Sequence, residues 1–291
     1  MSYRRKLRGT LAICKEQLKA AALTPRVWLG YLFGISAMLW KTTDYLGYSG
    51  SNAVQVFEPF IIVMNDYTYS AFILLGLLVV LVDSPFINDR SIYVAVRGSR
   101  RSWYCGMLLY LIAQILFYYL AIFAATALFC IQRAYIKNVW SESCYMLGMF
   151  HPQEALLEWG MVFDGEQVIP ALTPGEAFGL TYLLNVLYAV LLLFIAFLIN
   201  MTGRWVLGNL AAILIHLAGN VLIKSVYAAR LIWYSPLGYS QLVFRQFDEN
   251  GVADLYRPLL FFGFFLTAGF TAGLFMVKRN DFITAKGDRE L

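Results

Sequence analysis

Residues 173–200 read TPGEAFGLTYLLNVLYAVLLLFIAFLIN, and this stretch decides the class of fold. Its opening TPGE is typical of a helix start, with a capping box between Thr173 and Glu176 and proline at the first helical position. No charged residue follows Glu176 before Asn200. About 20 apolar residues are enough to span the hydrocarbon of a bilayer. The stretch therefore predicts a membrane-spanning helix over residues 174–200.

The rest of the chain has the same character. Of its 291 residues, 60% are apolar and only 14% are charged. Soluble domains contain roughly 45–50% apolar and about 25% charged residues. A water-soluble fold of this size could not bury so much apolar surface. We therefore expect an all-α integral membrane protein with a single transmembrane domain over residues 1–291 and no separate soluble domain.

Apolar runs separated by polar or turn-forming segments predict six spans. The expected spans are residues 26–46, 67–86, 103–131, 174–200, 205–226 and 258–277. The third is too long to stand upright in a bilayer, so we expect it to tilt or to project beyond it. The longest polar connection is a loop at residues 132–173, and a polar tail follows at 278–291.

A basic amphipathic helix is predicted before the first span, within residues 1–24. One apolar stripe is expected along it, formed by Leu7, Leu11, Cys14, Leu18 and Ala21. Arginine and lysine side chains lie mostly off this stripe. Such a helix is typical of the anionic inner interface of a membrane, and a solvated basic tail is the alternative.

The distribution of charge orients the spans. Sixteen lysines and arginines fall in segments expected on the inner side and seven in segments expected outside, which together make the 23 of the chain. Of the 18 acidic residues, twelve fall outside. Short loops rich in lysine and arginine stay in the cytoplasm. We expect a multi-pass protein of the plasma membrane with both termini in the cytoplasm.

Small and polar residues in the spans suggest how the helices pack. Two GxxxG pairs, Gly30 with Gly34 and Gly269 with Gly273, permit close approach of helices. Lys41 and Asp44 lie near the outer end of the first span, where they could reach the headgroups. Residues 47–66 mix apolar side chains with Glu58 and Asp66, which indicates an outer loop or a partly inserted segment.

Few polar residues lie deep in the predicted spans, and none of them is acidic. They are Gln114, Asn185, Asn209, His216 and Asn220. We interpret them as hydrogen-bonding groups between helices, with lining of a substrate path as the alternative. A proton- or sodium-coupled carrier would need buried carboxylates or broken helices. The sequence therefore argues against a proton- or sodium-coupled carrier.

Motifs for catalysis are missing from the sequence. It contains no P-loop GxxxxGK[ST], no HExxH, no GxSxG and no dinucleotide fingerprint, so we expect no ATPase or other enzyme activity in this chain. No metal site, bound cofactor or nucleic-acid partner is indicated. The four cysteines form no CxxC pair and are interpreted as free thiols, with a Cys130–Cys144 disulfide as the alternative.

The loop at residues 83–103 reads DSPFINDRSIYVAVRGSRRSW. It places a short apolar patch between basic residues on the expected cytoplasmic side. A short amphipathic helix there suits docking to a soluble partner, and a plain basic loop touching lipid headgroups is the alternative.

With these elements the chain resembles the permease subunits of type-2 ABC exporters, in particular those of Firmicute-type bacteria. The likeness lies in the basic N-terminal helix, the six spans, the DSPFINDR…RGSRRSWYCG string and the YSPL stretch at 234–237. It implies a coupling helix at Phe86–Val96 and short outer helices at Pro236–Phe247 and Val252–Arg257. The outer loop at 132–173 is longer than in many members of that family.

The resemblance also implies partners and roles. Two ABC ATPase subunits, carrying ATP and Mg²⁺, would dock on the coupling helix, and a second copy or a related permease would complete the path. The residues implied for docking are Phe86, Ile87, Asp89, Arg90, Ile92 and Tyr93. The cargo would be a peptide, a lipid or a drug. The rival hypotheses are a secondary carrier or channel, a non-transporting sensor or immunity-type membrane protein, and a membrane-bound enzyme.

Overall fold

The computed structural model describes residues 3–82, 99–202, 205–224, 232–247 and 253–279. The regular structure within them is helical, apart from β1 (Val54–Gln55) and β2 (Ala134–Tyr135), which form a short parallel pair, and an isolated bridge between Phe247 and Ala253. The long helices are α1 (Tyr3–Ala22), α2 (Pro25–Tyr48), α4 (Tyr69–Leu81), α6 (Arg100–Cys130), α10 (Pro174–Asn200), α11 (Trp205–Lys224) and α13 (Tyr256–Arg279). The short ones are α3 (Glu58–Met64), α7 (Glu142–Tyr145), the π-helix η1 (Met146–Phe150), α8 (Pro152–Trp159), α9 (Val168–Ala171), α12 (Pro236–Ser240) and the 3₁₀ helix η3 (Leu242–Phe244).

Four of these helices are long and apolar enough to cross a bilayer: α6, α10, α11 and α13. Two further pairs of helices meet this criterion only when each pair is counted as one span. Helices α1 and α2 are bent by 76° relative to each other, and α3 and α4 by 89°. The described part of the chain therefore offers between four and six spans. Large apolar side chains cover the outward faces of α2, α11 and α13, as lipid contact requires. The protein is an all-helical membrane protein, as expected.

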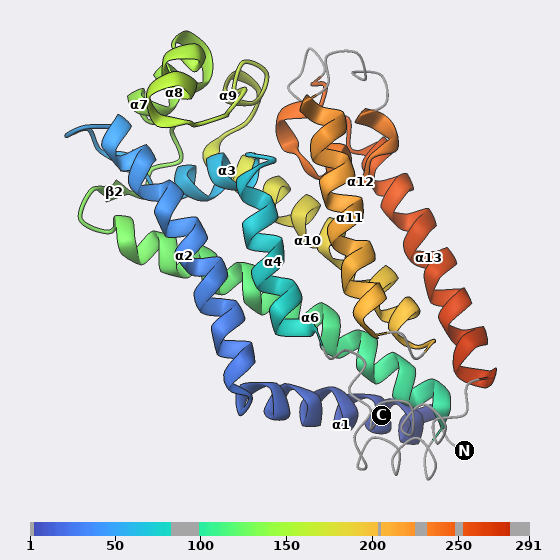
Figure 1. Ribbon diagram of the computed structural model, residues 1–291. Coiled ribbons are helices and arrows are strands. Elements are labelled where there is room, and N and C mark those ends of the chain that lie inside the picture. The colour runs from blue at the N-terminus through green and yellow to red at the C-terminus, as the bar shows by residue number, and fades with distance from the viewer. Residues whose placement is uncertain (1–2, 83–98, 203–204, 225–231, 248–252, 280–291) are drawn as a thin grey trace.

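The bundle has two distinct ends (Figure 1). At one end, which we call basal, α1 lies across the bundle. Helices α2, α6 and α11 begin at this end, and α4, α10 and α13 finish there. The opposite, distal end carries α3, α12 and a cap formed by residues 134–172, which includes α7, α8 and α9. The predicted loop at 132–173 therefore forms a folded cap with short helices.

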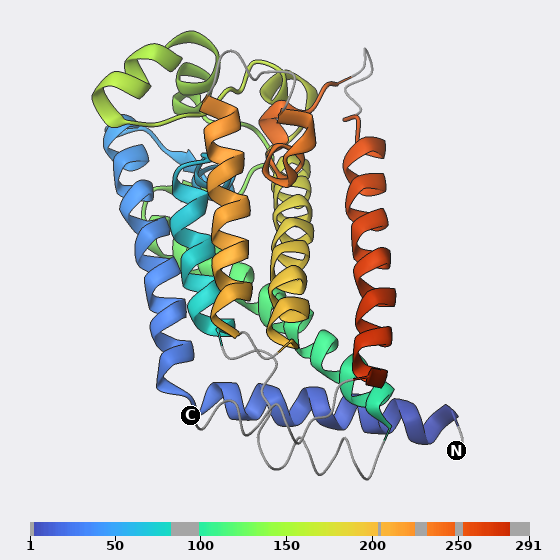
Figure 2. The ribbon, with the colours of Figure 1, turned by 45° about the vertical axis from the view of Figure 1, so that its right-hand side comes forward.

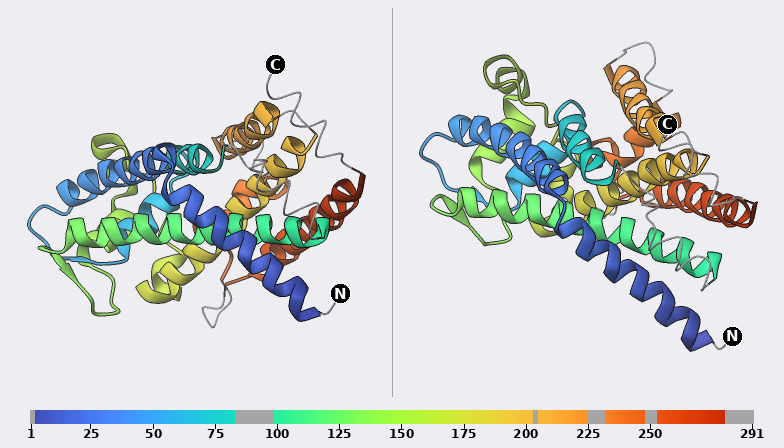
Figure 3. Two further views of the ribbon diagram at one scale, coloured as in Figure 1. Left: turned by 90° about the horizontal axis from the view of Figure 1, so that it is seen from below. Right: turned by 60° about the horizontal axis from the view of Figure 1, so that its bottom comes forward.

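Helix α1 meets α2 at a sharp bend and crosses the basal end of α6 (Figures 2 and 3). Its buried face comprises Ile13, Cys14, Gln17 and Ala21, whereas Leu7 and Leu11 are half exposed. The predicted stripe is therefore divided, because its second half packs on α6 and its first half faces outward. Gly106 of α6 makes this crossing possible, since an added Cβ would lie 2.8 Å from Cβ of Ile13.

Helix α6 runs obliquely through the molecule, as its length of 31 residues requires in a bilayer (Figures 1 and 3). Its fully buried tyrosines include Tyr104 and Tyr118. The hydroxyl of Tyr118 donates a hydrogen bond to the carbonyl oxygen of Ile73 in α4 at 2.7 Å. The hydroxyl of Tyr104 donates to the carbonyl oxygen of Phe270 in α13 at 3.2 Å. Helix α6 therefore contacts both sides of the bundle through polar groups that are satisfied inside it.

Glycines create the space for these hydroxyls. A Cβ at Gly34 of α2 or at Gly76 of α4 would collide with the hydroxyl of Tyr118, and one at Gly273 of α13 would collide with that of Tyr104. The backbones of α2 and α4 also touch, because a Cβ at Gly30 would lie 2.7 Å from the Gly76 carbonyl oxygen. Gly269 of α13 faces Phe194 of α10. Small residues let helices approach closely in membranes, where little hydrophobic force drives their association.

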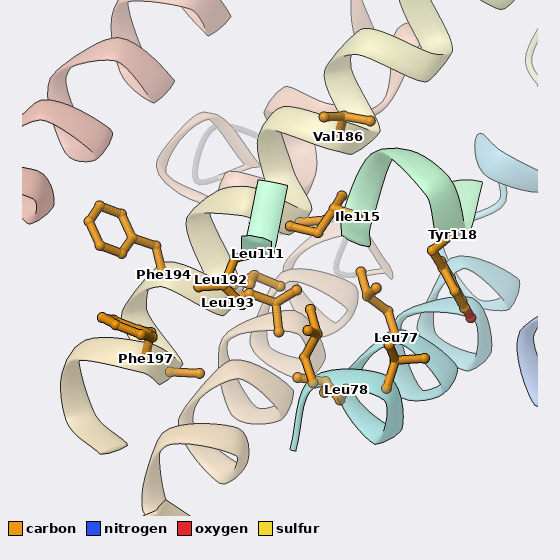
Figure 4. Packing of buried hydrophobic residues seen from close by; sticks show 14 of the residues in the cluster. Leu77, Leu78, Leu111, Ile115, Tyr118, Val186, Leu192, Leu193, Phe194 and Phe197 are labelled. Carbon is orange, nitrogen blue, oxygen red and sulfur yellow. The ribbon is translucent and has the colours of Figure 1, made fainter. Parts of the chain in front are cut away.

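The main hydrophobic core lies between α4, α6 and α10 (Figure 4). Leu77 and Leu78 come from α4, and Leu111 of α6 lies beside Leu192 and Leu193 of α10. A second hydrophobic cluster lies at the distal end and includes Tyr45, Ile61 and Trp140. The cap is therefore joined to the bundle by a core of its own.

The tyrosine–glycine contacts can be tested by substitution. Gly34→Ala should lower the free energy of unfolding by about 1–3 kcal/mol, because the new methyl group displaces the Tyr118 hydroxyl. Gly263→Ala is the matched control in α13, where nothing lies within 4 Å of an added Cβ. Denaturant unfolding of the purified protein in detergent measures both. Equal effects of the two substitutions would show that the close contact contributes nothing.

Candidate functional site

The expected docking residues, from Phe86 to Tyr93, lie outside the described residues. The elements that flank them are described. Helix α4 ends at Leu81 and α6 begins at Arg100, both at the basal end. The hydroxyl of Ser99 caps α6 by accepting a hydrogen bond from the backbone N–H of Ser102 at 3.0 Å. The predicted coupling segment is therefore connected directly to a firmly capped α6.

The five polar residues predicted in the spans do not converge on one site. Gln114 is buried in α6, and Asn185 donates to the Thr181 carbonyl oxygen of its own helix at 2.9 Å. Asn209 of α11 donates to the Val82 carbonyl oxygen at the end of α4 at 3.1 Å. The Asn209 bond joins α11 to the end of α4, as the first of the two interpretations made from the sequence expects, whereas the Asn185 bond stays within α10.

His216 and Asn220 form part of a polar cluster between α10 and α11. The Nδ1 atom of His216 lies 2.8 Å from the hydroxyl of Tyr188, and Nδ2 of Asn220 donates weakly to the His216 carbonyl oxygen at 3.5 Å. The His216 side chain is only 2% exposed, and its Nε2 has no hydrogen-bond partner among the described residues. A buried polar group of this kind inside a membrane bundle is a candidate functional group.

A break between α3 and α4 is the main polar feature that the sequence did not reveal. The two helices are bent by 89° at residues 65–68. Asp66 is buried at this break, and its Oδ1 accepts hydrogen bonds from the backbone N–H groups of Thr68 and Tyr69. Its Oδ2 has no partner within the described residues. The break thus carries a buried carboxylate with an oxygen still available for a bond.

Asn65 connects this break to two other parts of the chain. Its Nδ2 donates to the hydroxyl of Thr181 in α10 at 3.2 Å, and its Oδ1 accepts from the backbone N–H of Leu242 at 2.6 Å. Gln241 adds a bond of 3.3 Å to the Met64 carbonyl oxygen. The break is therefore fixed to α10 and to the segment between α12 and η3.

Glu58, at the start of α3, joins the cap to the bundle. Its fully buried carboxylate accepts hydrogen bonds from the Tyr45 hydroxyl, the Gln55 backbone N–H and both the hydroxyl and backbone N–H of Ser141, at 2.6–2.9 Å. The three residues that supply these donors lie in three different segments: α2, β1 and the turn before α7. Tyr135 of β2 lies nearby. The pKa of its hydroxyl is raised to about 12, mainly by burial and to a smaller extent by the negative charge of Glu58.

Lys41 is placed differently from the prediction. Its side chain is only 3% exposed and points into the cap instead of reaching the headgroups. The ammonium donates to the carbonyl oxygens of Trp159 and Gly160 at the end of α8 and forms an ion pair of 3.2 Å with Asp44. A helix C-terminus attracts a cation because its last carbonyl oxygens have no partner in the helix. This attraction explains the inward orientation.

A buried arginine anchors the segment between α11 and α13. Arg245 donates to the Gly238 carbonyl oxygen in α12 at 2.6 Å, and its guanidinium lies over the rings of Trp233 and Tyr239. Burial lowers its pKa to about 10, so the group stays charged at neutral pH. The resemblance implied one outer helix at 236–247, but the structure has α12 and η3, separated at Gln241. It implied a second at 252–257, where the described residues instead have a bridge between Phe247 and Ala253 and the start of α13 at Tyr256.

Parts of this polar network left a signal in the sequence. Glu58 stands before Pro59, and the pair Asn65-Asp66 interrupts two apolar runs. Proline near a helix start and a polar pair between runs indicate a helix boundary. Their burial depends on contacts with Ser141 and Leu242, more than 80 residues away in the chain, and this could not be read from local pattern.

No protein-family model, no curated protein and no solved structure matches this chain. The assignment of function therefore depends on the chemistry of its own residues. The described residues contain no group of three or more His, Cys, Asp or Glu side chains that could hold a metal ion, and all four cysteines are free. What the polar groups do is join helices, fix a helix break and attach a cap.

The role of Glu58 in attaching the cap can be tested. Glu58→Ala leaves several buried donors without an acceptor and should weaken the attachment by at least about 2 kcal/mol. Amide hydrogen exchange of residues 140–145 should then be about 30-fold faster. Glu166→Ala, an exposed position in the same cap, is the control and should leave exchange unchanged. Unchanged exchange in Glu58→Ala would contradict the assignment.

Proposed function

We propose that this chain is the membrane-spanning permease subunit of an ATP-driven exporter of the type-2 ABC class. It would lie in the plasma membrane with six spans and with both termini and the basal end in the cytoplasm. Two of its six spans would then be the bent pairs. A second copy or a related permease would complete the path for a peptide, a lipid or a drug.

The observation that carries this proposal is the charge of the basal end. Apart from Glu16, every charged residue of α1 and of the other helix ends there is a lysine or an arginine. The residues are Arg4, Arg5, Lys6, Arg8, Lys15, Lys19, Arg26, Arg100, Arg101, Lys278 and Arg279. Acidic residues instead gather in the distal cap. The positive-inside rule assigns such a basal end to the cytoplasm.

The position of α6 supports a coupling role for residues 83–98. Helix α6 follows this segment directly, packs against α1 at its start and contacts α4 and α13 through Tyr118 and Tyr104. A force applied to the segment would reach both sides of the bundle through this one helix. Contacts of this kind make transmission possible, and a test of coupling must establish it.

The mechanism would use energy supplied by separate ATPase subunits. These subunits would hold ATP and Mg²⁺ and dock on Phe86, Ile87, Asp89, Arg90, Ile92 and Tyr93. Nucleotide binding would favour one arrangement of the ATPase pair, and the docked segment would pass that preference to α6. Such a shift requires that the two states differ in their contacts with the ATPase.

Substitutions in the docking segment test the proposal. Arg90→Glu and Tyr93→Ala should each lower the amount of P-loop ATPase that co-purifies with the chain by at least about tenfold, as removal of an interface hot spot does. Their insertion and folding in the membrane should be unaffected. Lys137→Glu, at an exposed distal position, is the control. Full ATPase recovery with both docking variants would contradict the proposed interface.

A gradient-driven secondary carrier is the second candidate, because one observation favours it. The helix break with its buried Asp66 is the kind of feature that coupled carriers use to bind ions. Lys41 and Lys224 are positive charges near this carboxylate, which makes the site less suited to a cation.

Proton flux separates the two candidates. The purified chain alone, in liposomes with an internal pH dye, should not dissipate an imposed proton gradient if it depends on an ATPase. A carrier would dissipate the gradient, and Asp66→Asn would abolish the flux while Asp164→Asn, in the exposed cap, would not. Flux with that pattern would replace the exporter proposal.

A further inference from the structure

An apolar cavity lies between α6, α10 and α13, in the part of the bundle nearer its basal end. Its volume is about 160 Å³, and all nine residues that line it are apolar. Leu111 and Ile112 contribute from α6, Leu193 from α10, and Leu266 and Phe270 from α13. A cavity of about 150 Å³ with a similar lining stays free of water and accepts an apolar molecule. The cavity therefore suits part of a hydrocarbon chain.

The cavity is accessible from the surface of the bundle. Ile112 and Phe270, on its two facing helices, are 39% and 38% exposed. Helix α13 is the least buried of the four long candidate spans, and its exposed side carries phenylalanine and leucine side chains. In a bilayer the surroundings of this face are acyl chains. An apolar tail could therefore enter sideways between α6 and α13.

Cationic side chains lie below the cavity on both of these helices. Arg101 is about two turns before Leu108, the first cavity residue of α6, and Lys278 is about two turns after Phe270 on α13, which is roughly 10–12 Å along each helix. The two helix ends meet there, because Nη1 of Arg100 donates to the Lys278 carbonyl oxygen at 3.1 Å. The side chains of Arg101 and Lys278 are exposed. An anionic group at the membrane surface would face this pair.

We infer that α6, α10 and α13 form a binding site for an anionic phospholipid of the basal leaflet, with one acyl chain in the cavity and the headgroup at Arg101 and Lys278. The acyl chain alone gives no selectivity, since lipid tails surround the helices everywhere. Selectivity comes from the headgroup, and each cationic residue near the surface contributes about fivefold in affinity. The site does not depend on the exporter assignment.

This site places a lipid where it can influence α13. Tyr104 and Phe270 join α6 to α13 at the basal edge of the cavity, which Phe270 itself lines, through the hydroxyl–carbonyl hydrogen bond and a ring contact of 5.6 Å. A tail above this contact and a headgroup below it would bridge the two helices on the lipid side. The bound lipid would thus act as a structural ligand that keeps α13 against α6.

Native mass spectrometry of the full chain in detergent tests the inference. Dioleoyl phosphatidylglycerol and dioleoyl phosphatidylcholine are added at equal concentration. The wild type should retain one phosphatidylglycerol at least about tenfold more than phosphatidylcholine. Ile112→Trp, which obstructs the mouth from a partly exposed position, and Leu193→Trp, which fills the cavity, should each lower this retention about tenfold. Leu210→Trp on the exposed face of α11 is the control and should not.

Charge variants distinguish headgroup binding at this site from a general attraction of anionic lipid to the basic surface of the protein. Arg101→Gln combined with Lys278→Gln should reduce the preference for phosphatidylglycerol at least about tenfold. The control removes the same charge from the exposed face of α1, by Lys15→Gln with Lys19→Gln, and should leave the preference intact. Equal retention of both lipids by the wild type, equal effects of the two charge pairs, or full retention by Ile112→Trp would each overturn the inference.

Discussion

The arrangement of this protein depends on two tyrosine hydroxyls that α6 inserts into gaps left by glycines. Tyr118 enters between Gly34 of α2 and Gly76 of α4, and Tyr104 enters beside Gly273 of α13. Inside a bilayer a hydroxyl without a partner is costly, and little hydrophobic force holds helices together. Each tyrosine meets both requirements. Its hydroxyl donates a hydrogen bond to a backbone carbonyl oxygen, and its ring fills the space beside a glycine. Helix α6 thereby contacts α2, α4 and α13 at close range.

The two ends of the bundle are built differently. The distal end is rich in buried polar groups, and the hydrogen bonds of two of them, Glu58 and Lys41, hold the cap in place. The basal end carries an amphipathic helix and exposed cations. Such a division suits a protein whose distal side is a fixed cover and whose basal side meets charged surfaces, whether these are lipid headgroups or a soluble partner. The helix ends that flank the proposed ATPase-docking segment, Leu81 of α4 and Arg100 of α6, lie at this basal side, as does the proposed lipid site.

Local pattern was sufficient for the long helices. The predicted bounds 174–200 agree with α10, since its capping box and its apolar run are both local signals. The GxxxG pairs were predicted at helix contacts, but the tyrosines that fill them lie in a different helix and leave no local signal. The break at residues 65–68 was not predicted as such, because the bonds that fix it reach Thr181 and Leu242. The inward turn of Lys41 depends on the end of α8, which is 118 residues away.

Sidedness is the claim on which the proposed function most directly depends. Single cysteines can be placed at Glu166 in the cap and at Lys15 on α1, both exposed, in a chain whose four native cysteines are replaced by serine. A membrane-impermeant maleimide should label the cysteine at position 166 in intact cells and the one at position 15 only after permeabilisation. Labelling of position 15 in intact cells, with position 166 protected, would contradict a cytoplasmic basal end and with it the docking of an ATPase there.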